Sequence, residues 1–73
     1  MLMFSPVQYV NPADVVLLTR SSYRGSDGQF VHQVNLFLRD WDEPISQMWD
    51  TDKQAEQVFN RILDDLKIWK HEL

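Results

Sequence analysis

The stretch VVLLTRSSYRGSDGQFVHQVNLFL, residues 15–38, decides the fold. Its two flanks, residues 15–23 and 30–38, are rich in β-branched and aromatic residues that alternate with polar ones, as in half-buried strands. The pair Asp27-Gly28 between them is typical of a tight turn. The stretch therefore predicts an antiparallel β-hairpin.

The register of this hairpin decides which side chains face the core. A two-residue loop at either possible position pairs odd-numbered with even-numbered residues, whereas an odd-length loop would set the charged Arg20 opposite the apolar Val34. We therefore expect a two-residue loop. The predicted core face holds Val15, Leu17, Thr19, Ser21, Tyr23, Phe30, His32, Val34, Leu36 and Leu38. The predicted opposite face holds Val16, Leu18, Arg20, Ser22, Arg24, Val31, Gln33, Asn35, Phe37 and Arg39.

From Thr51 onward the hydrophobic period changes to that of a helix. Thr51 and Gln54 fit the capping box that begins a helix. At about 100° per residue the apolar side chains that follow share one arc. These are Ala55, Val58, Phe59, Ile62, Leu63, Leu66, Trp69 and Leu73. We predict a C-terminal amphipathic helix over residues 52–71.

The predicted fold is α+β, with a small antiparallel sheet of three to four strands and the helix packed on one of its faces. Residues 6–10 alternate weakly and predict a short first strand, which Asn11-Pro12 would end in a turn or a single helical turn. A chain of 73 residues predicts one compact domain.

Composition narrows the functional classes. The chain has no cysteine, which excludes disulfides, thiolate nucleophiles and zinc motifs that contain cysteine. The apolar start MLMFSPVQYV has no basic residues and is interrupted at Pro6, so we expect no signal peptide and no membrane span, and we predict a cytoplasmic protein. A net charge of −4 argues against general affinity for nucleic acid and favours a protein partner with a basic surface.

No residue pattern predicts catalysis. His32 lies among positions expected to face the core, and His71 lies near the end of the predicted helix, where it suits the helix dipole. The acids Asp40, Asp42 and Glu43 lack the glycine-centred loop of a calcium site. We therefore predict no catalytic residue, no metal and no cofactor.

The stretch DWDEPISQMWD, residues 40–50, sets two tryptophans among carboxylates and is interpreted as a connector from the hairpin to the helix. Trp49, just before the helix, is predicted to turn into the small core. Trp41, between Asp40 and Asp42, is predicted to lie on the side away from the helix, available to a partner.

These features predict a non-enzymatic protein-interaction module, a small acidic regulator or inhibitor that docks on a larger protein machine. The basic groove of a nucleic-acid enzyme such as RNA polymerase suits such a domain, and a phage-encoded regulator of a host enzyme is one hypothesis. The predicted contact residues are Asp40, Trp41, Asp42, Glu43, Phe37, Arg39, Arg20, Leu18 and Val31.

Several alternatives remain open for the sheet face opposite the helix. Its arginines Arg20, Arg24 and Arg39, beside aromatic residues, could bind single-stranded nucleic acid. Its apolar side chains could instead pair with a second copy in a homodimeric structural subunit, be covered by residues 1–5, or form an ordinary surface.

Overall fold

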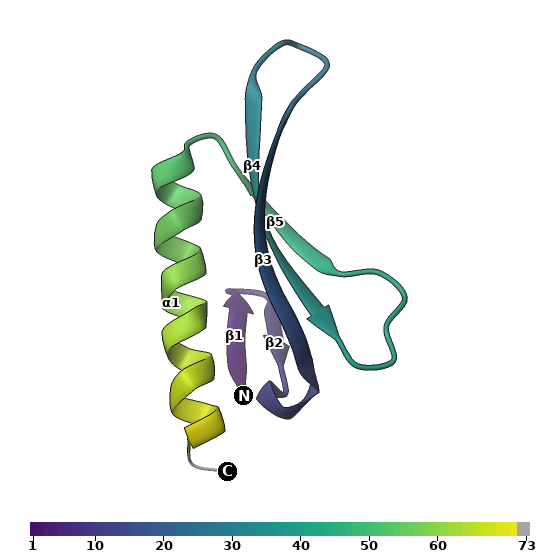
Figure 1. Cartoon of the computed structure of the whole chain (residues 1–73), viewed down its shortest axis with the longest axis vertical. Helices are drawn as coiled ribbons and strands as arrows, with labels where there is room; N and C mark the ends of the chain where they lie inside the picture. Colours follow the sequence, from purple (N-terminus) through teal and green to yellow (C-terminus); the bar gives the residue numbers. More distant parts are fainter. Residues whose placement is uncertain (72–73) are drawn as a thin grey trace.

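The computed structural model describes residues 1–71 and consists of two small sheets and one long helix (Figure 1). Strands β1 (Leu2–Ser5) and β2 (Gln8–Val10) form an antiparallel hairpin, and a single 3-10 turn, η1 (Pro12–Asp14), follows. Strands β3 (Val15–Arg24), β4 (Phe30–Leu38) and β5 (Ile45–Trp49) form an antiparallel sheet in that order. Helix α1 (Asp52–His71) packs against this sheet. The predicted α+β fold is confirmed.

The N-terminal residues form a complete hairpin, not the single strand predicted over residues 6–10. Pro6-Val7 makes its turn. Leu2 and Phe4 on β1 are 1% and 0% exposed, so this segment supplies a large part of the core. The hairpin lies between helix α1 and the sheet (Figure 1), and residues 1–5 therefore do not cover the opposite sheet face.

The loop of the β3-β4 hairpin has three residues, 26–28, and the expected two-residue loop is wrong. Gly25 N donates to Gln29 O over 2.7 Å and closes the loop. Gly28 has a φ of 83°, and the side chain of Asp27 accepts from Gln29 N at 3.0 Å. A turn followed by a left-handed residue is a common three-residue hairpin connection. Both the two-residue and the three-residue loop favour Asp and Gly at these positions, so the residue types in the loop do not distinguish the two lengths.

The odd-length loop places Arg20 opposite Val34, the pairing that we expected the sequence to avoid. Arg20 tolerates this position because its guanidinium reaches the helix. Its Cζ lies 5.9 Å from the centroid of the Phe59 ring, and its Nη1 lies 3.9 Å from Glu56 Oε2. A long side chain can cover apolar surface in this way while its charge stays near water.

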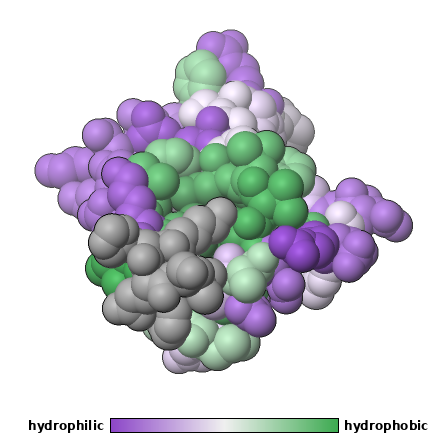
Figure 2. All heavy atoms as spheres, turned by 60° about the horizontal axis from the view of Figure 1, so that its bottom comes forward, coloured by the Kyte–Doolittle hydropathy of each residue, from purple (hydrophilic) through white to green (hydrophobic). Residues whose placement is uncertain are grey.

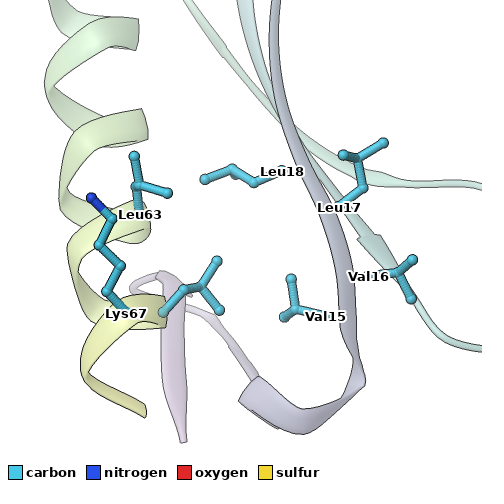
Figure 3. Close-up of a pocket in the computed structure, with 7 residues that line it drawn as sticks. Val15, Val16, Leu17, Leu18, Leu63 and Lys67 are labelled. Atoms are coloured by element: carbon cyan, nitrogen blue, oxygen red, sulfur yellow. The ribbon is translucent and has the colours of Figure 1, made fainter. Parts of the chain in front are cut away.

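The change of register moves most β3 side chains to the other face of the sheet. A bulge between Val15 and Leu17 makes Val16 the extra residue, so Val15 still faces the core at 6% exposure, as predicted. Figure 3 shows Val15 and Leu18 pointing toward the helix and Leu17 pointing away. The helix side of β3 therefore holds Val15, Leu18, Arg20, Ser22 and Arg24, and the other side holds Leu17, Thr19, Ser21 and Tyr23.

The predicted connector contains the third strand of the sheet. Residues 45–49 pair with β4, which sets Ile45 opposite Leu36 and Trp49 opposite His32. The sequence ISQMW of residues 45–49 does not alternate regularly between apolar and polar residues, so its pattern alone does not predict this strand. Trp49 packs against the core, as predicted.

Helix α1 has the predicted bounds and the predicted apolar stripe. Thr51 Oγ1 accepts from Gln54 N at 3.2 Å, which confirms Thr51 as the cap. Six stripe residues are buried or partly buried, namely Ala55, Val58, Phe59, Ile62, Leu63 and Leu66. The side chains of Trp69, His71 and Leu73 lie outside the described part of the chain. Within residues 1–71, no helix is both long and apolar enough to cross a membrane.

Gly28→Ala is expected to lower the free energy of unfolding by about 1–2 kcal/mol, because a left-handed backbone places Cβ too near the following carbonyl oxygen. Nothing lies within 4 Å of the added Cβ, so the cost is conformational. Urea unfolding of Gly28→Ala measures this loss in the free energy of unfolding, and Ser26→Ala, in the same exposed loop, is the control. Equal stabilities would contradict the left-handed conformation of Gly28.

Candidate partner-binding site

The structure divides the predicted contact residues among three places. Val31 and Phe37 lie on the sheet face away from the helix, as predicted. Leu18 and Arg20 lie on the helix side, so their predicted place on the other face is wrong. The remaining residues lie on the Trp41 loop, which we define as residues 39–44: Arg39, Asp40, Trp41, Asp42 and Glu43. The nine residues therefore do not form one surface.

The sheet face away from the helix, here the open face, is uncharged. Its residues are Leu17, Thr19, Ser21, Tyr23, Val31, Gln33, Asn35, Phe37, Ser46 and Met48. Asn35 orders its centre: it accepts from Ser46 Oγ at 2.7 Å and donates to Thr19 Oγ1 at 3.3 Å. Helix α1 and the β1-β2 hairpin both lie on the other side of the sheet (Figure 1).

This arrangement removes the surface on which the nucleic-acid alternative depended. Arg20 and Arg24 lie on the helix side, with the Arg24 guanidinium 5.1 Å from the Phe30 ring centroid. The Arg39 guanidinium turns to η1, where Nη2 donates to Ala13 O at 3.4 Å. The predicted sheet face that joins three arginines to aromatic side chains is therefore wrong.

A groove between β3 and α1 collects apolar side chains at the end of the molecule where β3 begins (Figure 2). It has a volume of about 600 Å³, and Leu18, Leu63 and Lys67 line it (Figure 3). Lys67 adjoins the part of the helix whose side chains lie outside the described residues. We assign the groove no role.

The Trp41 loop borders a pocket of about 470 Å³, here the Trp41 pocket. Val10 and Leu38 are nearly buried in it, at 9% exposure each. Its exposed walls are Trp41, Tyr9 and Val7, at 61%, 57% and 89%. Trp41 thus stands beside strand β2 and not on the open face, which corrects its predicted position and leaves its predicted exposure intact.

Two backbone hydrogen bonds fix the start of the Trp41 loop. Arg39 N donates to Asp14 O at 2.7 Å, which ties the loop to η1, and Trp41 N donates to Leu38 O at 3.3 Å, which closes a turn at the end of β4. Asp40 between them has a φ of 66°, a left-handed conformation that Asp tolerates better than most residues. Asp40 therefore contributes a negative charge and is also a residue type that tolerates the left-handed backbone of this loop.

The surroundings of the Trp41 pocket are acidic. Asp14 lines it, Asp42 and Glu43 line an adjoining hollow that also includes Trp41, and Asp40 precedes Trp41. With Arg39, these residues carry a formal charge of 1 − 4 = −3. The contacts between basic and acidic side chains found in the described part of the chain, Arg20 with Glu56 and His32 with Asp52, use none of these four acids.

Ser22, His32 and Asp52 also meet, but their geometry is not that of a catalytic triad. Ser22 Oγ lies 2.7 Å and Asp52 Oδ1 lies 3.7 Å from the same atom, His32 Nδ1. A triad requires the serine and the carboxylate at opposite ring nitrogens, so that one nitrogen takes the serine proton while the carboxylate accepts from the other and orients the ring. Among the described side chains, those of residues 1–68, there is also no group of three or more metal-ligating residues.

The residues of the Trp41 pocket were only partly predictable. The sequence predicts that Trp41 is exposed and that its neighbours Asp40, Asp42 and Glu43 are charged, whereas Tyr9 and Val7 reach the site because the N-terminal hairpin folds back beside β4 and β5.

Comparisons of the chain with known protein families, curated proteins and solved structures found no match.

Proposed function

We propose that the protein is a non-enzymatic interaction module that holds a basic segment of another protein in the Trp41 pocket. One observation carries this proposal. Trp41 and Tyr9, from distant parts of the chain, line one pocket whose surroundings carry four carboxylates against one arginine.

The pocket offers what a lysine or arginine side chain needs. An ammonium or guanidinium is attracted to the face of a Trp or Tyr ring, and nearby carboxylates supply charge-assisted hydrogen bonds. The aliphatic stem of such a side chain can pack on Val7 and Ile45, which line the same pocket. Trp and Tyr are also the residue types that most often carry binding energy at interfaces.

The charge of the whole chain supports the same direction of recognition. At a net charge of −4, the protein attracts basic surfaces at long range and increases the rate of encounter with them. A large enzyme with a basic nucleic-acid groove, RNA polymerase included, belongs to the class of partner we propose. A regulatory role on such an enzyme, in phage or elsewhere, is part of this proposal.

Self-association remains a separate prediction. The uncharged open face, with Leu17 and Met48 exposed by 51% and 63%, favours it. Sedimentation at increasing protein concentration tests this alternative without reference to the Trp41 pocket.

Selection from a random peptide library on the immobilised protein should enrich Lys and Arg over Asp and Glu by about tenfold or more, which corresponds to about 1.4 kcal/mol. The variant Asp42→Asn with Glu43→Gln keeps the shape of the loop and should lose most of this enrichment. The matched control, Asp50→Asn with Asp64→Asn, removes two exposed charges outside the pocket and should keep it. Equal enrichment of acidic and basic residues would refute the proposal.

A further inference from the structure

Strand β3 forms one edge of the three-stranded sheet, and only its inner side pairs with β4. Among the described residues, no strand pairs with its outer side, here the β3 edge. The register is regular from Leu17 to Arg24, and this stretch contains no proline. The end of the β3-β4 hairpin that carries the loop also projects beyond helix α1 (Figure 1). Folded proteins usually interrupt or cover such an edge, so a long regular one without a partner strand requires a physical reason.

A hydrogen bond of the hairpin loop determines which backbone groups point outward. Gly25 N donates to Gln29 O, so Gly25 and Gln29 form a hydrogen-bonded pair. Along an antiparallel ladder such pairs alternate with pairs that exchange no hydrogen bonds. The odd-numbered residues of 17–23 therefore direct their N–H and C=O groups toward β4, and the even-numbered residues of 18–24 direct theirs to the β3 edge. These outward residues are Leu18, Arg20, Ser22 and Arg24.

The β3 edge is complementary to itself. A second copy placed antiparallel, with a two-fold axis at Ser21, pairs Leu18 with Arg24 of the second copy and Arg20 with Ser22 of the second copy. A slide by two residues in one direction sets Arg20 opposite Arg20 of the second copy, and a slide in the other direction sets it opposite Arg24. Like charges that lie directly opposite destabilise a strand pair. The register centred on Ser21 therefore pairs all the outward residues and keeps the arginines from facing one another.

The position of helix α1 leaves room for this pairing. The helix contacts β3, β4 and β5, so it lies over the sheet and not beyond its β3 edge. In the two-fold arrangement both helices lie on the same side of the joined sheet, and β4 is separated from its copy by three strand spacings, about 14 Å. Helices can pack with their axes about 8–10 Å apart, so the two copies of α1 do not collide.

We propose that a second copy of the chain binds antiparallel along the β3 edge, so that the two β3-β4-β5 sheets become one continuous sheet. Each outward residue exchanges two backbone hydrogen bonds with its partner on the second copy. Arg20 keeps Glu56 of its own chain, 3.9 Å away, as its counter-charge. This interface uses the strand edge and not the open face, and it does not depend on the function proposed for the Trp41 pocket.

The first test is a disulfide crosslink at the two-fold axis. The proposed register sets Ser21 opposite Ser21 of the second copy in a pair without hydrogen bonds, with a Cα–Cα distance of about 4.5 Å. This distance lies within the range of roughly 4.4–6.8 Å that a disulfide spans. The chain has no cysteine of its own, so Ser21→Cys introduces the only thiol. In a glutathione redox buffer, Ser21→Cys should form disulfide-linked dimers.

Thr19→Cys is the matched control for Ser21→Cys. Both hydroxyls accept a hydrogen bond from Asn35 Nδ2, at 3.3 Å for Thr19 and 3.2 Å for Ser21, so both variants lose the same kind of contact. In the proposed register Thr19 lies opposite Tyr23 of the second copy, about 13 Å along the strand from the second Thr19. Thr19→Cys should therefore give at least about tenfold less linked dimer than Ser21→Cys. Equal yields from the two variants, or no crosslink with Ser21→Cys, would overturn the proposal.

Sedimentation of the unaltered protein is the second test. An interface made by one strand edge is small, so the dimer should be weak and should become evident as the protein concentration is raised to about 1 mM. Ser22→Pro removes one outward N–H donor and no hydrogen bond to β4, so it should raise the dissociation constant at least about tenfold. Ser22→Ala keeps the N–H and loses the hydroxyl, as Ser22→Pro does, and should change the constant by less than about twofold.

Two results of the sedimentation experiment would also overturn the proposal. One is a protein that stays monomeric up to about 1 mM. The other is a dimer that Ser22→Pro leaves unchanged, which would assign self-association to another surface such as the open face. Circular dichroism of Ser22→Pro establishes that the variant folds, and the crosslinking comparison holds even if it does not.

Discussion

Phe4→Ala is expected to lower the free energy of unfolding by about 3–5 kcal/mol, because it removes a buried aromatic ring and leaves a cavity. Phe4 is 0% exposed and belongs to the main core cluster. A domain of 73 residues has a total stability of roughly 4–11 kcal/mol, so this change removes a large share of it. Urea unfolding followed by circular dichroism measures the loss.

Val7→Ala is the matched control for Phe4→Ala. Val7 belongs to the same hairpin and is 89% exposed, so its truncation should change the free energy of unfolding by less than about 0.5 kcal/mol. A similarly small effect of Phe4→Ala would mean that the N-terminal hairpin does not complete the core.

Trp41→Ala is expected to weaken the binding of a selected basic peptide by about 30-fold or more, equivalent to about 2 kcal/mol, the loss typical of a central interface residue. Its effect on the free energy of unfolding should stay below about 1 kcal/mol, because the Trp41 side chain is 61% exposed and makes few core contacts. Fluorescence anisotropy of a labelled peptide measures the affinity.

Met48→Ala is the control for Trp41→Ala. Met48 is 63% exposed but lies on the open face, so its truncation should change the affinity for the peptide by less than about twofold, or about 0.4 kcal/mol. A greater loss with Met48→Ala than with Trp41→Ala would transfer the binding site to the open face.

The hairpin β3-β4 and helix α1 were predictable because their signals are local. Alternation predicts the two strands, and an apolar stripe behind the Thr51 cap predicts the helix. The exposure of Trp41 and the inward position of Trp49 also followed from their neighbours in the chain. In each case, residues within a few positions determine the outcome.

The register of β3 was not predictable from alternation because it depends on the conformation of one glycine. Gly28 adopts a left-handed conformation and adds a residue to the loop, which exchanges the two faces of β3 after the bulge at Val16. The rejected pairing of Arg20 with Val34 proved acceptable since Phe59 and Glu56, distant in sequence, receive the arginine. Such contacts join residues that are distant in sequence, so the alternation of apolar and polar residues within a strand does not predict them.

The other side of the candidate site was unpredictable for the same reason. Nothing near Trp41 in the sequence indicates that Tyr9 and Val7 stand beside it. Their positions follow from the burial of Leu2 and Phe4, which docks the hairpin against the helix and the sheet. The residues of the site therefore come together only through the docking of this hairpin, which the sequence near Trp41 does not predict.

The most direct test of the central claim is a map of amide shifts when a short Lys- and Arg-rich peptide is added to the ¹⁵N-labelled protein. We expect the largest shifts at the Trp41 indole and at the backbone amides of Tyr9 and Asp14, with little change at Asn35 and Met48 on the open face. Shifts concentrated on the open face, or no shift at the Trp41 indole, would contradict a basic-segment site in the Trp41 pocket.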